Sequence, residues 1–134
     1  MEKEQIYSII SSSEFAESLN DSTIEKLSEA MNANQYTPSK KIYTANTAVS
    51  TFIFIYSGSC NMVDSDNNII RTISKGDFFG LISLFTNSSK NYSLITVEET
   101  TTLELKKEDL EALTLQFQDV KNELLQVVNQ RLFN

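Results

Sequence analysis

The sequence Gly76-Asp77-Phe78-Phe79-Gly80 places two aromatic residues between two of the chain's three glycines. Glycine adopts backbone conformations with positive φ more easily than other residues, so this spacing predicts two sharp changes of direction around a very short strand. The apolar segment Leu81–Phe85 follows directly. It is too short for a full helix, and we predict about one helical turn there.

Short β-rich runs separated by turn residues surround this segment, from residue 34 to residue 105. The run Phe52-Ile53-Phe54-Ile55-Tyr56 is strongly apolar and β-prone, and the turn Ser57-Gly58-Ser59 ends it. Asn46 follows an earlier run, and asparagine tolerates a left-handed turn conformation. The other runs are 41–44, 60–63, 69–73, 92–97 and 100–105. Strands of this length at regular spacing are typical of a roll, barrel or sandwich.

Both ends of the chain carry helical patterns. Apolar residues between positions 6 and 15 form a first stripe, and a second helix is predicted to begin near Asp21 or Ser22, where Ser22-Thr23-Ile24-Glu25 fits a capping box. Residues 107–115 predict a further helix. The last segment carries an extended apolar stripe at helical spacing, formed by Phe117, Val120, Leu124, Val127, Val128 and Leu132.

The composition argues against several classes of function. The net charge is −7, from 11 basic and 18 acidic side chains, and it opposes binding to nucleic acid or to anionic membranes. The absence of histidine removes histidine-based catalytic triads and His-ligated metals. Paired carboxylates such as Asp64 and Asp66 lie on a polar hairpin tip, where solvation explains them. We therefore expect a protein that is not an enzyme and needs no cofactor.

The cysteine content indicates the compartment. Cys60 is the single cysteine, so the chain cannot form an internal disulfide, and a reducing, cytoplasmic location is expected. The N-terminus lacks the pattern of a secretory signal. The longest apolar run, residues 52–56, is far shorter than a membrane span.

The order of these features resembles the cyclic-nucleotide-binding domain of catabolite activator proteins, cyclic-nucleotide-dependent kinases and gated channels. Residues 52–58 are similar to the family's strand that ends in a glycine turn, and residues 76–80 to its Gly-Asp-aromatic-Phe-Gly signature. Residues 81–87 then occupy the place of its phosphate-binding cassette. The resemblance implies a mainly β fold with flanking helices, a double-stranded β-helix or jelly-roll-like β-roll. It predicts one domain over residues 1–134, with N-terminal helices (1–33), the β-roll (34–106) and C-terminal helices (107–134).

The resemblance also implies a ligand site. In the family, main-chain amides beside a glycine hold the cyclic phosphate, an arginine pairs with its oxygens, and a glutamate accepts a hydrogen bond from the ribose 2′-hydroxyl. In this sequence the glutamate position is Leu81, the arginine position is Lys90, and the bulky Tyr92 replaces a small residue. The candidate ligand-binding residues are Gly80, Leu81, Ile82, Ser83, Lys90, Asn91, Tyr92 and Ser93.

These replacements predict weak or altered binding of cyclic nucleotides. Leucine cannot accept a hydrogen bond and lysine lacks the planar fork of a guanidinium, and together the two changes are worth about two to four orders of magnitude in affinity. Leu81 fits two interpretations: a core residue that fills an emptied pocket, or an apolar wall for a different ligand.

We expect a regulatory module that senses a small anionic ligand, and two other functions stay open. One is a ligand-free scaffold for protein interaction, with the C-terminal stripe as a homodimer contact, although the stripe fits packing within its own chain equally well. The other is the sensor fragment of a transcription regulator without its helix-turn-helix domain.

Overall fold

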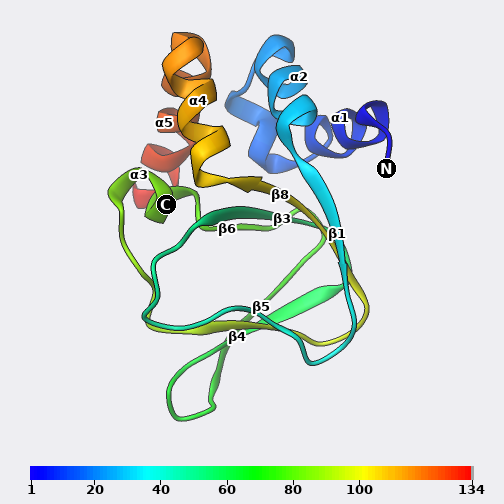
Figure 1. The fold of residues 1–134 in the computed structure, drawn as a ribbon, viewed down its shortest axis with the longest axis vertical. Coiled ribbons are helices and arrows are strands. Elements are labelled where there is room, and N and C mark those ends of the chain that lie inside the picture. Colours follow the sequence, from blue (N-terminus) through cyan, green and yellow to red (C-terminus); the bar gives the residue numbers. More distant parts are fainter. Residues whose placement is uncertain (134) are drawn as a thin grey trace.

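The chain folds into two sheets and a layer of helices (Figure 1). A computed structural model describes the backbone of residues 1–133 and the side chains of residues 1–130. The helices are α1 (Lys3–Ser11), the 3-10 helix η1 (Glu14–Ser18), α2 (Asp21–Ala30), α3 (Leu81–Thr86), α4 (Lys107–Gln116) and α5 (Gln118–Phe133). The strands are β1 (Asn32–Tyr36), β2 (Lys41–Tyr43), β3 (Thr51–Ser57), β4 (Ser59–Val63), β5 (Ile69–Ser74), β6 (Phe78–Phe79), β7 (Ser93–Thr96) and β8 (Thr100–Lys106).

The two sheets are antiparallel and lie one above the other (Figure 1). The first has the strand order β1-β8-β3-β6 and the second the order β2-β7-β4-β5. The helices gather beside the first sheet, which therefore lies between the helical layer and the second sheet. This arrangement confirms the predicted mainly β fold with flanking helices, a jelly-roll-like β-roll.

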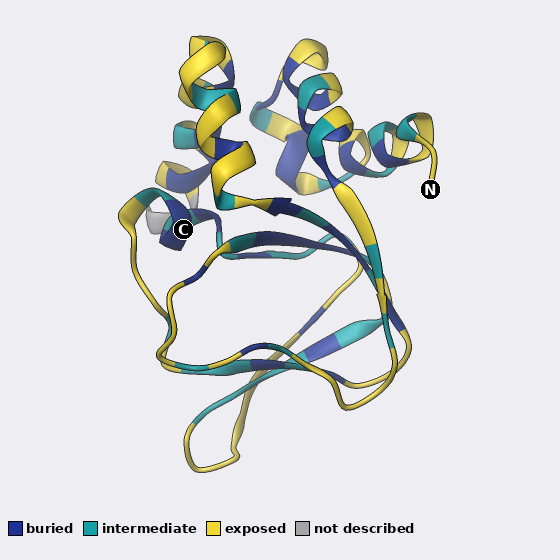
Figure 2. Cartoon of the chain, in the orientation of Figure 1, coloured by how far each residue is buried: buried dark blue, intermediate teal, exposed yellow. Residues whose placement is uncertain are grey.

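Strand β3 is buried on both faces, which explains its unbroken apolar sequence. Phe52 and Phe54 point to the helical layer, where their ring centroids lie 5.4 Å and 6.3 Å from that of Phe15 in η1. Side chains alternate along a strand, so Ile53 and Ile55 face the second sheet. All four strand residues are at most 3% exposed. Figure 2 shows this buried central strand and the exposed outer faces of the helices.

The predicted elements are confirmed, with differences at their ends. Strand β1 begins at Asn32, two residues before the predicted start of the β region. The capping box predicted at residues 22–25 is wrong, because α2 begins at Asp21 and is capped by Asn20, whose side chain accepts a hydrogen bond from the Thr23 backbone N–H at 2.8 Å. Asparagine is as favourable an N-cap as serine, and Glu123 of α5 holds this one by accepting from its side-chain amide at 2.9 Å.

The apolar stripe of the C-terminal segment packs within the chain. Helix α5 contacts η1 and α2, and its buried residues, all at most 7% exposed, are Val120, Leu124, Val127 and Val128. Phe117 is half-buried, and the side chain of Leu132 lies outside the described residues. These four side chains are buried within their own chain and are not available to a second copy. For them the structure supports packing within the chain and not the predicted homodimer contact.

Val120→Asp is expected to destabilise the fold strongly, because it places an unpaired carboxylate at a site with no solvent exposure. The expected loss in the free energy of unfolding is at least ~3 kcal/mol, measured by urea denaturation. Leu115→Asp is the control, because Leu115 on α4 is 88% exposed and its replacement should change stability by less than ~0.5 kcal/mol. A Val120→Asp variant as stable as the wild type would contradict the described packing of α5.

Candidate ligand-binding site

The chain turns sharply at Gly80, between β6 and α3. Gly80 has a φ of 96°, in the left-handed region. A Cβ atom at this position would lie 2.8 Å from the carbonyl oxygen of Thr51 and 3.0 Å from Cγ1 of Val49. Conformation and contact therefore both require glycine. The turn directs the predicted short helix, α3, against the start of β3.

The first turn of α3 contains unused hydrogen-bonding groups. An α-helix leaves its first N–H groups without intrahelical acceptors, and Gly80, at the N-cap, has no side chain to accept from them. The hydroxyl of Ser83 adds another group, since it is fully buried and no described residue forms a hydrogen bond with its Oγ. Buried polar groups without partners are rare and costly, so the Ser83 hydroxyl marks a place where a ligand can supply the missing bond.

A cavity of about 180 Å³ lies beside this turn. Its walls come from the β4–β5 hairpin, from β6 and α3, and from the loop before β7. The lining residues are Met62, Arg71, Ile73, Asp77, Phe78, Phe79, Gly80, Leu81, Ile82, Ser83, Lys90 and Tyr92. Apolar and aromatic side chains combined with two cations suit a small ligand that has a flat apolar part and an anionic part.

The structure brings six of the eight predicted site residues to this cavity, namely Gly80, Leu81, Ile82, Ser83, Lys90 and Tyr92. Asn91 is exposed and does not line the cavity. Ser93 does not line it either. Its Oγ accepts a hydrogen bond from the backbone N–H of Ala45 at 3.0 Å, so it joins β7 to the loop after β2.

Leu81 and Lys90, the two replaced positions, differ in their surroundings. Leu81 is 2% exposed and belongs to the hydrophobic core while it also forms part of the cavity wall. Lys90 is half-buried, and its backbone is fixed: its N–H donates to the Tyr43 hydroxyl at 2.9 Å and its carbonyl accepts from the Asn46 N–H at 2.7 Å. Its ammonium group has no hydrogen-bond acceptor among the described side chains.

Aromatic rings form one wall of the site. The centroid of Phe79 lies 4.9 Å from that of Tyr43 and 6.1 Å from that of Tyr92. Burial raises the pKa of the Tyr92 hydroxyl and Tyr43 raises it further, whereas the positive charge of Arg71 lowers it. The net shift is upward, so the Tyr92 phenol is uncharged at neutral pH and can donate a hydrogen bond or stack on a planar ligand.

The predicted site left out six lining residues, Met62, Arg71, Ile73, Asp77, Phe78 and Phe79. Met62 and Arg71 are register partners in the β4–β5 ladder, and alternation along β5 puts Arg71 on the same face as Ile73. Which strands border the cavity depends on long-range packing, so the spacing of residues along the chain does not show that this face of the hairpin reaches it. One signal was present, since Arg71 is the single charged residue of β5.

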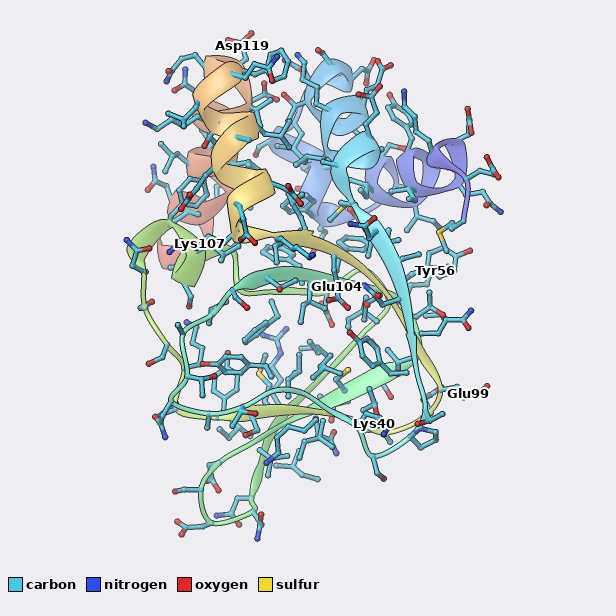
Figure 3. The ribbon with its side chains drawn as sticks, in the orientation of Figure 1. Lys40, Tyr56, Glu99, Glu104, Lys107 and Asp119 are labelled. Carbon is cyan, nitrogen blue, oxygen red and sulfur yellow. The ribbon has the colours of Figure 1, made fainter. Side chains whose placement is uncertain are left out.

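The far end of α3 is tied to α4. Asn87 ends α3 with a φ of 53°, and the ammonium group of Lys107 donates a hydrogen bond to its side-chain oxygen. Lys107 is the first residue of α4 and lies beside α3 in Figure 3. Its backbone N–H donates to the carbonyl of Ser50 at 2.9 Å. Ser50 precedes Thr51, whose carbonyl contacts the Gly80 turn. Both ends of α3 are therefore linked to the start of β3, one directly at Gly80 and the other through Lys107.

A separate polar cluster lies between the two sheets. Glu104 of β8 is the register partner of Ile53, which faces the second sheet, and Figure 3 shows it within the roll. Its Oε2 accepts hydrogen bonds from the hydroxyls of Tyr36 at 2.7 Å and Thr102 at 2.5 Å. Burial and then Glu104 raise the pKa of Tyr36, which therefore stays a donor. Both bonds go to one oxygen of the carboxylate, and none of the three residues lines the cavity at Gly80.

Within the described part of the chain, no group of three or more His, Cys, Asp and Glu side chains is placed to hold a metal ion. None of the helices, as far as they are described, combines the length and apolar character needed to cross a bilayer.

The family model of the cyclic nucleotide-binding domain matches residues 33–117, which is more than half of the chain. The chain therefore belongs to the cyclic-nucleotide-binding domain family, a class of regulatory and signalling domains. The resemblance drawn from residues 52–87 is confirmed.

Relatives and solved structures agree with this assignment. The cAMP-dependent protein kinase regulatory subunit of Candida albicans is 32% identical over 71 residues, which are 53% of this chain and 16% of the relative. The regulatory subunit of a cAMP-independent protein kinase A from Trypanosoma brucei shares the fold with a TM-score of 0.84 at 15% identity, covering 98% of this chain and 46% of that one. The corresponding subunit from Trypanosoma cruzi, bound to guanosine, has a TM-score of 0.82 at 14% identity with the same coverage. The chain thus spans less than half the length of each.

Gly80→Ala is expected to destabilise the domain by about 2–4 kcal/mol, because a side chain is strained at this φ and its Cβ would overlap the Thr51 carbonyl. Gly76→Ala is the matched control. Gly76 has a φ of 90° but nothing within 4 Å of a Cβ, so only the backbone strain of about 1–2 kcal/mol applies. Urea denaturation measures both losses, and equal values would contradict the close contact at Gly80.

Ser83→Ala is expected to stabilise the ligand-free domain by about 1 kcal/mol, because it removes a buried hydroxyl that has no partner. Ser28→Ala is the matched control in α2. Ser28 is 2% exposed and its Oγ donates to the Ile24 carbonyl at 2.7 Å, so its loss should destabilise by about 1 kcal/mol. The unfolding free energies should therefore change with opposite signs. A destabilised Ser83→Ala variant would mean that the hydroxyl is satisfied in solution.

Proposed function

We propose that this domain is a non-catalytic regulatory module that binds a cyclic nucleotide, or a closely related small anion, in the cavity at Gly80. The observation that carries the proposal is the buried Ser83 hydroxyl, which has no described partner and lies beside the uncapped first turn of α3. A phosphate oxygen placed there would accept hydrogen bonds from the hydroxyl and from main-chain amides together. Gly80 permits the close approach that this requires.

The same cavity favours weak or altered binding of ribose cyclic nucleotides. Leu81 presents carbon where a ribose hydroxyl needs an acceptor, and Lys90 offers a single ammonium group in place of a guanidinium fork. The volume of about 180 Å³ is also smaller than the roughly 300–1,000 Å³ that is usual for sites of drug-sized ligands. A whole nucleotide must therefore move the walls apart as it enters, and this movement reduces affinity.

A second candidate function is a ligand-free interaction scaffold, and the burial of Leu81 favours it. With 2% exposure and a place in the core, this side chain partly fills the space that a ligand would use. A scaffold of this kind would meet its partner or a second copy through a surface other than the buried face of α5. A sensor unit of a transcription regulator is compatible with either function.

We also propose that residues 1–134 act as one domain. The hydrogen bonds from the side chains of Asn20 and Thr23 to Glu123 support this, because they join the N-terminal helices to α5. A reducing, cytoplasmic location is proposed from Cys60, which is buried and has its pKa raised by burial to about 11, so that it remains a thiol.

Calorimetric titration with cyclic AMP, cyclic GMP and guanosine tests the proposed function. The wild type is expected to bind cyclic AMP in the millimolar range. Leu81→Glu combined with Lys90→Arg should raise its affinity for cyclic AMP about 100-fold or more, because the pair restores an acceptor for the ribose hydroxyl and a guanidinium for the phosphate.

The matched ligand for this experiment is 2′-deoxy cyclic AMP, which lacks the hydroxyl. Leu81→Glu alone should gain affinity for cyclic AMP and gain none for the deoxy compound. If neither the wild type nor the double variant gives heat or a shift in melting temperature with any of these ligands at about 10 mM, the ligand-binding proposal is wrong and the scaffold function stands in its place.

A further inference from the structure

Two cations reach the cavity from different elements. Lys90 lies in the loop before β7, and Arg71 lies on β5, the edge strand of the second sheet. The register of the β4–β5 ladder pairs Arg71 with Met62, and both side chains line the cavity. Arg71 is an exposed residue that borders the cavity, and it lies outside the 80–93 segment that holds the other candidate contacts.

Neither cation is neutralised by an acidic neighbour. No described carboxylate forms an ion pair with Arg71 or Lys90, whereas Lys3 pairs with Glu25 at 3.2 Å and Glu29 at 2.6 Å. The acidic residue of the cavity wall is Asp77, and its Oδ2 is used by the backbone N–H of Ser74 at 2.9 Å.

The position of these two cations makes them informative. Among the described residues only Lys3 forms ion pairs, so an unpaired cation is common in this chain, but Arg71 and Lys90 both line one cavity of a protein whose net charge is −7. Two unpaired cations beside a fully buried, unpartnered hydroxyl, that of Ser83, give this cavity a local positive potential and a polar point of attachment. An anion is the ligand chemistry that satisfies all three groups at once.

The surroundings of Arg71 also place its charge at the ligand space. The positive charge of Arg71 opposes the upward shift in the pKa of Tyr92, so the two side chains are electrostatic neighbours. Tyr92 lines the same cavity and packs edge-on against Phe79 at 6.1 Å between centroids. A planar guanidinium beside aromatic rings can form paired hydrogen bonds with a phosphate or carboxylate, which the ammonium of Lys90 cannot do.

We infer that Arg71 is a ligand-binding residue: from β5 it supplies the guanidinium contact to the anionic group of the ligand, while Lys90 and Ser83 contact the same group from the segment after Gly80. This inference rests on the proposed function and adds to it a residue and a wall of the site. It also gives the second sheet a direct part in recognition, since β5 belongs to that sheet.

The test compares a charged and an uncharged probe on one variant. Chemical-shift titration of the 134-residue chain with cyclic AMP and with adenosine measures a dissociation constant for each, and both are expected in the millimolar range. Arg71→Gln should weaken binding of cyclic AMP about 10-fold or more and change binding of adenosine less than about 2-fold, because only cyclic AMP carries the anion. Arg71→Lys should recover part of the loss, since it restores the charge without the fork.

Lys75→Gln is the matched control, because it removes the same charge from an exposed side chain that does not line this cavity. It should change binding of cyclic AMP less than about 2-fold. Unchanged cyclic AMP binding by Arg71→Gln, or an equal loss for both probes, would overturn the role of Arg71 and leave the proposed function intact. A wild-type chain that binds neither probe would overturn the role of Arg71, and the proposed function would then fall as well if the Leu81→Glu, Lys90→Arg variant also binds no ligand. The amide spectrum of each variant reports whether it is folded.

Discussion

The left-handed turn at Gly80 is the constraint on which the candidate site depends. Its backbone approaches the Thr51 carbonyl so closely that a Cβ would lie 2.8 Å from that oxygen. This contact fixes the direction in which α3 leaves β6, and that direction determines where the uncapped amides and the Ser83 side chain lie. A single missing methyl group therefore sets the geometry of one wall of the cavity, and the sheets around it act as the support.

Two neighbouring residues of α3 have opposite effects on the free protein. Leu81 is 2% exposed and adds apolar contacts to the core, whereas the Ser83 hydroxyl is buried without a described partner and opposes folding. Leu81 thus contributes to the stability of the free domain. Ser83 lowers that stability but offers a hydrogen bond to a ligand. The cavity is small because Leu81 and the aromatic wall occupy it, and it is polar because Ser83, Arg71 and Lys90 border it.

Local patterns predicted most of the fold, and long-range register limited the rest. The apolar run of β3 and the glycine at position 80 determine local structure through residues next to them in the sequence. The strand, the turn and the short helix were therefore all predicted. The candidate site came from the family resemblance, which pointed to residues 80–83 and 90–93. Arg71 could not be found in this way, since it lies on β5, outside both segments, and only the packing of the β4–β5 hairpin brings it to the cavity. The apolar stripe around Val120 has the same spacing whether it packs on its own chain or on another, so the sequence could not choose between them. The N-cap of α2 was misplaced because Asn20 and Ser22 are both good capping residues and lie two positions apart.

The hydrogen bond between the side chains of Lys107 and Asn87 joins α3, which lines the cavity, to α4. Lys107 is the first residue of α4, and its backbone N–H donates to the carbonyl of Ser50, just before β3. This one residue therefore contacts the end of α3, the start of β3 and the C-terminal helices. A rearrangement of α3 must either carry the first turn of α4 with it or break this bond. A shift of α3 would reach α4 through this one side-chain hydrogen bond, although α4 and α5 do not line the cavity.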